Sequence, residues 1–101
     1  MNIKNAVKTL EKNNGAFTFA TFILGIRTTL DLTQSEMAKK LGLSKSALCE
    51  IEKGRTLVSP QTAVKYAKKS GFSITLALEA CLQDQLNKAN IKKRVFIKDA
   101  A

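Results

Sequence analysis

The sequence predicts a mostly α-helical protein organised around two short helices that a tight turn connects. Apolar residues recur at helical spacing along most of the chain, capping residues precede these runs, and glycines follow them. At 101 residues, with 45% hydrophobic and 25% charged residues, the chain is long enough for one modest core. We divide it into an N-terminal helix (1–16), a central domain (17–71) and a C-terminal extension (72–101).

Residues 1–16 are expected to form a short amphipathic helix that ends at Asn13-Asn14-Gly15. Its apolar face comprises Ile3, Ala6, Val7 and Leu10. Packing of this helix on the domain or on a partner subunit is the favoured interpretation, and a DNA-binding arm is the alternative.

The two central helices carry the strongest local signals. Thr33 and Glu36 have the spacing of a capping box, and Gly42 follows where the first helix must end. Ser44 then caps a second helix over residues 45–53, which Gly54 closes. The apolar positions of the two helices are Met37, Ala38 and Leu41, then Ala47, Leu48 and Ile51. Two helices joined by such a turn have the geometry of a helix-turn-helix.

Helices are expected on both sides of this pair. Thr18 precedes an apolar pattern of helical spacing that runs from Phe19 to Leu30. Further along, Ser59 and Pro60 combine an N-cap with a proline in the first helical turn, and Gly71 ends that helix.

The central stretch resembles the XRE family of Cro- and phage-repressor-like proteins, over residues 26–72. The matching positions are Gln34, Ala38, Gly42, Ser44, Ile51, Glu52 and Gly54. The resemblance implies a five-helix, lambda-repressor-like domain that binds double-stranded DNA through its second central helix.

The resemblance also implies roles for individual residues. By position in the family motif, the base readers would be Lys45, Ser46 and Glu50. The phosphate contacts would be Gln34, Ser44, Lys53, Arg55 and Thr56. In the family, an arginine at the Arg27 position pairs with the glutamate at the Glu52 position, so we expect a structural ion pair there. Cys49 stands where many relatives carry a polar residue, either as a tolerated small side chain or as a redox sensor.

The extension allows two interpretations. Phe72, Ile74, Leu76 and Leu78 alternate with more polar residues, which favours a strand over 72–78 and then a helix over 79–90, although the apolar positions also fit a helix. A lone strand would need a partner, so we expect these four residues to form a dimer contact, similar to that of Hip-type antitoxins. Residues 88–101 are basic and form a small strand, a tail that orders on binding, or a frayed end.

Composition limits the function. A net charge of +9 favours a polyanionic partner, with a merely solubilising surface as the alternative. The chain has no histidine, and Cys49 and Cys81 stand far apart, so we expect no metal site, no cofactor and no enzymatic activity. Without an apolar run of roughly 20 residues, a cytoplasmic protein that avoids membranes is expected.

These observations predict a sequence-specific, DNA-binding transcriptional regulator that acts as a homodimeric repressor on a palindromic operator. An antitoxin that represses its own operon and binds a toxin protein is slightly favoured over a stand-alone, phage-type repressor. A protein-interaction module that keeps the fold without using DNA is the alternative from another class.

Overall fold

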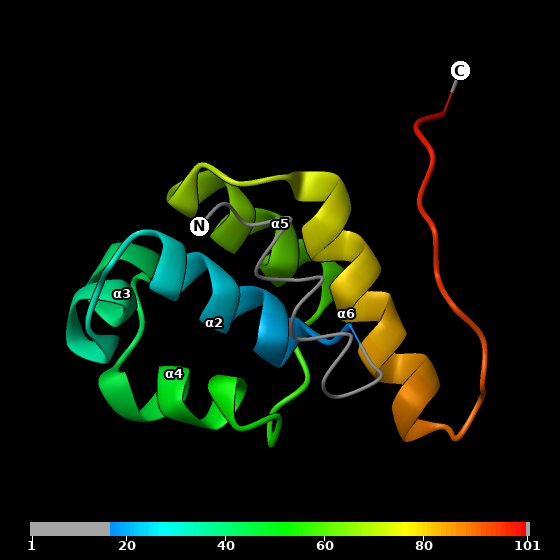
Figure 1. Ribbon diagram of the computed structural model, residues 1–101, viewed down its shortest axis with the longest axis horizontal. Coiled ribbons are helices and arrows are strands. Elements are labelled where there is room, and N and C mark those ends of the chain that lie inside the picture. The colour runs from blue at the N-terminus through cyan, green and yellow to red at the C-terminus, as the bar shows by residue number, and fades with distance from the viewer. Residues whose placement is uncertain (1–16, 101) are drawn as a thin grey trace.

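The computed structural model describes residues 17–100, and this part of the chain contains five α-helices (Figure 1). In chain order they are α2 (Phe19–Thr29), α3 (Gln34–Leu41), α4 (Lys45–Glu52), α5 (Pro60–Ser70) and α6 (Ile74–Lys88). The mostly helical fold predicted from the sequence is therefore confirmed. The helix expected within residues 1–16 lies outside the described residues.

The helix starts follow the capping residues in the sequence. The side-chain oxygens of Thr18, Thr33, Ser44 and Ser59 each accept a hydrogen bond from the backbone N–H three residues later. Each bond satisfies one of the N–H groups that the first helical turn leaves without an intrahelical partner. Gly42 and Gly71 end α3 and α5 in the left-handed region, with φ of 76° and 77°.

All five helices contribute to one core. In Figure 1, α2 runs through the middle of the molecule and contacts both α4 and α6. Fully buried large side chains come from four of the helices and comprise Phe19, Phe22, Ile23, Ile26, Met37, Leu41, Leu48 and Cys81. The helix α5 adds Ala63 and Ala67, whose small side chains allow close packing of α5 against α6.

The strand predicted over 72–78 is wrong, because this stretch opens α6. Ser73 caps the helix, and its hydroxyl accepts a hydrogen bond from the Leu76 N–H at 3.1 Å. Ala77, Ala80 and Cys81 then lie on one buried face. A helix satisfies its backbone groups internally, whereas a lone strand cannot, so no second subunit is needed to complete this segment.

The dimer contact predicted from that strand loses its basis. Phe72 and Leu76 are half-buried and pack against the core of their own chain. Leu78 is also half-buried, and Ile74 is exposed at 38%. These four side chains therefore do not form the strand edge that was expected to pair between subunits.

The chain beyond α6 runs in an extended conformation along that helix (Figure 1). Gln83 and Glu79 of α6 accept hydrogen bonds from the backbone N–H groups of Val95 and Ile97, at 2.8 and 2.9 Å. Residues 91–100 form no strand, and the tail is an extended segment held on α6, which differs from each of the three interpretations given for it. None of the helices between residues 17 and 100 has both the length and the apolar character needed to cross a membrane.

Candidate nucleic-acid interface

The helix α4 lies along one edge of the molecule, below α2 and α3 in Figure 1. Leu48 and Ile51 anchor it to the core with 0% and 5% of their surface exposed. Lys45 and Ser46, which precede these anchors, are exposed, and Glu50 is partly exposed. The three predicted base readers therefore lie on α4 outside the core, at the accessible surface of a helix whose other face is fixed.

The turn between α3 and α4 is defined by backbone hydrogen bonds. The Leu43 N–H donates to the Ala38 carbonyl at 2.8 Å, and Leu43 packs partly against the core. From α5, the Lys69 ammonium donates to the Leu41 carbonyl at 3.3 Å, where the negative end of the α3 dipole lies. The Lys69 contact was not predicted, because nothing in the sequence indicated that α5 passes the end of α3.

Arg27 and Glu52 form a two-point ion pair, as the family resemblance implied. Arg27 Nε lies 2.7 Å from Glu52 Oε2, and Nη2 lies 3.2 Å from Oε1. Arg27 also donates to the Leu32 carbonyl at 3.1 Å. The Glu52 side chain is only 6% exposed, so the pair links α2 to the end of α4 within a largely water-excluded site.

Gln34 joins this ion pair. Its amide nitrogen donates to Glu52 Oε1 at 2.9 Å, so Glu52 holds the start of α3 as well as α2. This positions α3 and α4 relative to each other. Gln34 was expected at a phosphate, and that role stays a prediction, since the second hydrogen of its amide nitrogen is not used by the bond to Glu52.

Glu50 and Arg55 lie together at the exposed end of the interface. Arg55 Nη1 is 3.3 Å from Glu50 Oε1, with 63% and 43% of the two side chains exposed. The Arg55 N–H also donates to the Glu50 carbonyl at 3.0 Å. A predicted base reader and a predicted phosphate contact are thus coupled in the free protein, a relationship that spacing alone did not indicate.

The other predicted phosphate contacts flank α4. Ser44 Oγ accepts the Ala47 N–H at 3.0 Å, which leaves the hydroxyl hydrogen able to donate to a phosphate oxygen. Lys53 and Thr56 are exposed beyond the other end of α4. Together with Lys45, these groups place hydrogen-bond donors at both ends of the helix.

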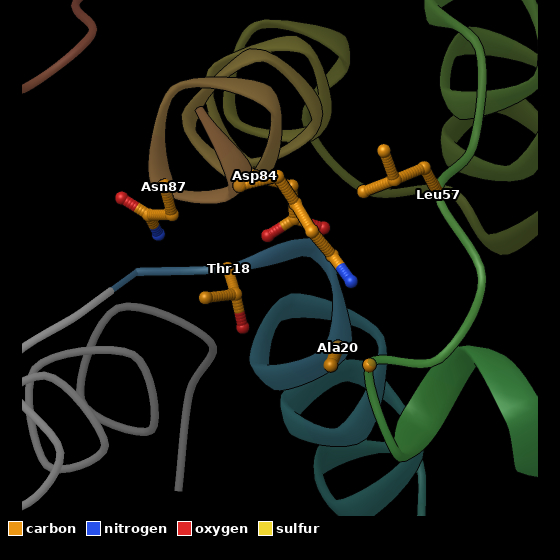
Figure 2. A pocket seen from close by; sticks show the side chains of 7 residues that line it. Thr18, Ala20, Leu57, Asp84 and Asn87 are labelled. Atoms are coloured by element: carbon orange, nitrogen blue, oxygen red, sulfur yellow. The ribbon is translucent and has the colours of Figure 1, made fainter. Parts of the chain in front are cut away.

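A cavity of about 220 Å³ lies between the start of α2, the C-terminal half of α6 and the connection that follows α4 (Figure 2). Asp84 lines it and accepts the Phe19 N–H at 3.2 Å, so it caps the start of α2. Burial raises the pKa of Asp84 above its ordinary value, while the Phe19 N–H and the Lys88 charge act in the other direction. Sequence patterns missed this residue, since it acts across two distant helices.

The two cysteines differ in their surroundings. Cys49 is half-buried on α4 beside the predicted base readers. Cys81 is buried in the core, where its thiol donates to the Val58 carbonyl at 3.0 Å. Burial raises the pKa of the Cys81 thiol, which makes it a structural group. Within residues 17–100, no three His, Cys, Asp or Glu side chains gather as a metal site would require.

A compact set of helices that fixes one polar, accessible helix after a glycine turn defines a DNA-binding domain of the helix-turn-helix class. Residues 25–76 match the helix-turn-helix family model, and the chain belongs to this XRE-type family. An uncharacterized HTH-type transcriptional regulator of Methanocaldococcus jannaschii is 44% identical over 48 residues, which are 48% of this chain and 73% of that protein. No solved structure matched the chain significantly.

Proposed function

We propose that the protein is a sequence-specific transcriptional repressor that occupies a palindromic operator as a homodimer. The observation that carries this proposal is the anchoring of α4. Leu48 and Ile51 fix one face in the core, which leaves Lys45, Ser46 and Glu50 accessible to base edges. The similarity to a protein named as a transcriptional regulator supports the same class of function.

The exposed side chains on α4 suit the major groove, which is wide enough to admit a helix. Lysine donates to guanine O6 or N7, and glutamate accepts from cytosine N4. Serine is shorter and discriminates less. The net charge of +9 supplies the attraction to phosphates on which sequence-independent affinity depends.

Homodimer formation follows from the number of bases that one helix reads. A single recognition helix contacts too few base pairs to select one site in a genome, whereas a two-fold dimer reads two half-sites. We expect half-sites about 10–10.5 base pairs apart, so that both recognition helices meet the same side of the duplex.

The antitoxin form of this proposal has lost its structural support. One of its two grounds was a dimerising strand over 72–78, whereas residues 74–78 belong to α6. The other ground, that a small basic regulator without a sensor domain takes its signal from a protein partner, comes from the sequence. A stand-alone repressor is therefore the form that we propose, and a toxin partner becomes an outcome of the test below. An interaction module without DNA binding is disfavoured by the exposed cations around α4, namely Lys39, Lys40, Lys45, Lys53 and Arg55.

The test is selection from random duplexes at about 0.15 M salt, followed by sedimentation of the selected complex. We expect an inverted repeat and two protein chains per duplex. Recovery of unrelated sequences, or equal affinity for a shuffled duplex, would contradict sequence-specific binding. One chain per duplex would contradict the dimer. The last experiment is purification of the tagged protein from its own cells. A toxin that co-purifies in stoichiometric amount would restore the antitoxin alternative.

A further inference from the structure

The tail after α6 is held on that helix as a neighbouring strand would hold it. The Lys93 carbonyl accepts a hydrogen bond from the Gln83 amide nitrogen at 2.8 Å, and the Val95 N–H donates to the Gln83 oxygen at 2.8 Å. The Ile97 N–H donates to Glu79 at 2.9 Å. A single amide side chain thus replaces the donor and acceptor of one residue in a β-ladder.

The spacing explains why this arrangement fits. Val95 and Ile97 are two residues apart in an extended chain, which separates them by about 6.6 Å. Gln83 and Glu79 are four residues apart in a helix, which separates them by about 6 Å along its axis. Since the order is reversed, the tail runs antiparallel to α6 and uses one edge for these bonds.

The other edge of the tail carries the N–H groups of Phe96 and Lys98. In extended backbone, successive N–H groups point to opposite edges, so those of Phe96 and Lys98 face away from α6. Neither has a hydrogen-bond partner among residues 17–100. Both residues are exposed, and Phe96, at 79%, is the most exposed large hydrophobic residue in the part of the chain that the structure describes. This tail therefore offers an edge strand with a prominent aromatic anchor.

The charge of the edge selects its occupant. Lys92, Lys93 and Lys98 are exposed around Phe96, and Arg94 lies 5.7 Å from the Phe96 ring. Lysine on a free edge discourages pairing with a second copy of the same strand, because like charges would be brought together. It favours a strand whose side chains are acidic.

The position of the edge separates it from the DNA interface. In Figure 1 the tail lies on the far side of α6 from α4, the helix that carries the predicted base readers. We infer that residues 95–98 form a docking strand for an extended acidic segment of a partner protein, which would add as a β-strand beside Phe96 and Lys98. This inference does not depend on the proposed repressor function.

The test uses the full chain and a synthetic peptide of about nine residues that alternates glutamate with valine and carries a central phenylalanine. Amide hydrogen exchange is followed by NMR for each tail residue. Val95 and Ile97 should exchange slowly in the free protein, whereas Phe96 and Lys98 should exchange quickly. Saturating peptide should slow exchange at Phe96 and Lys98 by about tenfold or more.

Two variants and two control peptides sharpen this experiment. Phe96→Pro removes an edge N–H and the aromatic ring while allowing extended backbone, and should weaken peptide binding by about tenfold or more. Leu57→Ala is the matched control, since Leu57 is also exposed, at 45%, but lies outside the tail. It should leave binding unchanged. Peptides with lysine in place of glutamate, or with N-methylated pairing amides, should bind at least about tenfold more weakly.

Several results would overturn the inference. Equal binding of the acidic and lysine peptides would remove charge selection, and equal binding of the N-methylated peptide would remove strand pairing. Slow exchange at Phe96 that appears without peptide and grows with protein concentration would assign the edge to a second copy of the chain. Protection by a DNA duplex, with none by the peptide, would make the tail a nucleic-acid arm.

Discussion

Arg27 and Glu52 are joined by two hydrogen bonds, of 2.7 and 3.2 Å, between the third-last residue of α2 and the last residue of α4. Glu52 is almost fully buried, and it also accepts the amide nitrogen of Gln34 at the start of α3. A single carboxylate thus connects three helices. Because α4 carries the predicted base readers, the orientation of these side chains depends on a residue whose own side chain is buried.

Glu52→Ala should lower the free energy of unfolding by about 3 kcal/mol, because it leaves the Arg27 charge without its carboxylate in a largely buried site. Urea unfolding of both proteins measures the difference. Glu50→Ala is the matched control, since it breaks the exposed pair with Arg55 and should cost less than about 1 kcal/mol. Equal losses in the two variants would show that burial of the pair does not matter.

Leu48→Ala should destabilise the protein by about 2–5 kcal/mol. The Leu48 side chain of α4 is fully buried in the core, so truncating it leaves a cavity. Thermal and urea unfolding report the loss, and DNA binding should fall with the folded fraction. Leu57→Ala removes the same atoms from an exposed position and should change stability by no more than about 0.5 kcal/mol. A folded Leu48→Ala protein of wild-type stability would contradict the role assigned to this anchor.

Lys45→Ala should change which sequences are preferred, whereas Lys53→Ala should weaken binding to all sequences alike. The reason is that we propose Lys45 as a base reader and Lys53 as a phosphate contact. Competition binding to the selected operator and to single-base variants measures the first effect. The salt dependence measures the second, since loss of one phosphate contact should reduce the slope of log K against log salt by about 0.9. Identical, sequence-independent losses would reject this division of roles.

Arg55→Ala is a less selective change than Lys53→Ala, because it also releases Glu50 from its ion pair. We expect a uniform loss of affinity together with an altered preference at the base that Glu50 contacts. The double variant with Glu50→Gln should retain the uniform loss and lose the altered preference. The same competition assay checks both, and an unchanged base preference in Arg55→Ala would show that the pair does not tune Glu50.

Asp84→Asn should stabilise the protein at pH 7 relative to the wild type. Burial raises the folded-state pKa of Asp84 above 3.8. The contribution of this carboxyl to folding stability is therefore present below the unfolded pKa and is lost as pH rises through the folded pKa, so that at pH 7 the wild type carries a buried charge. Asparagine keeps an oxygen for the Phe19 N–H and carries no charge. Thermal unfolding from pH 3 to 7 should show a gain that disappears toward acid, where the wild-type carboxyl is protonated.

Glu36→Gln is the control of opposite sign. The Thr33 backbone N–H, and then its hydroxyl, lower the pKa of Glu36 below 4.5. The contribution of the Glu36 carboxylate to folding stability is therefore present above the unfolded pKa and is lost as pH falls through the folded pKa. This variant should therefore be less stable than the wild type at pH 7, and the difference should disappear in acid. Parallel pH profiles for the two variants would contradict both assignments.

The sequence predicted the helix starts well, because the capping interactions that set them act within one helical turn. The cap residues Thr18, Thr33, Ser44 and Ser59 are within hydrogen-bonding reach of the turn that follows them, so spacing alone locates each helix start. The prediction over 72–78 failed because alternation of apolar residues also fits a half-buried helix. Ser73 was the overlooked signal, since it has the side chain and position of an N-cap.

Contacts between distant segments could not be predicted from the sequence. The side chain of Asp84 accepts a backbone N–H 65 residues away, at the start of α2, and Lys69 donates to a carbonyl 28 residues away, at the end of α3. Gln83 bonds to backbone groups of the tail that are 10 and 12 residues away. No spacing rule relates such pairs, because the distance between them is set by how the helices pack. The Arg27–Glu52 pair was anticipated only through family resemblance, not by derivation from either residue.

The sequence by itself determined the helical class, the helix-turn-helix and the residues on the exposed part of α4, because caps, glycine turns and apolar periodicity act over one to two helical turns. Tertiary structure alone decided that Glu52 joins three helices and that Gln83 and Glu79 hold the tail on α6. These outcomes depend on which backbone groups are satisfied across the packed core, and that is settled only when distant segments meet.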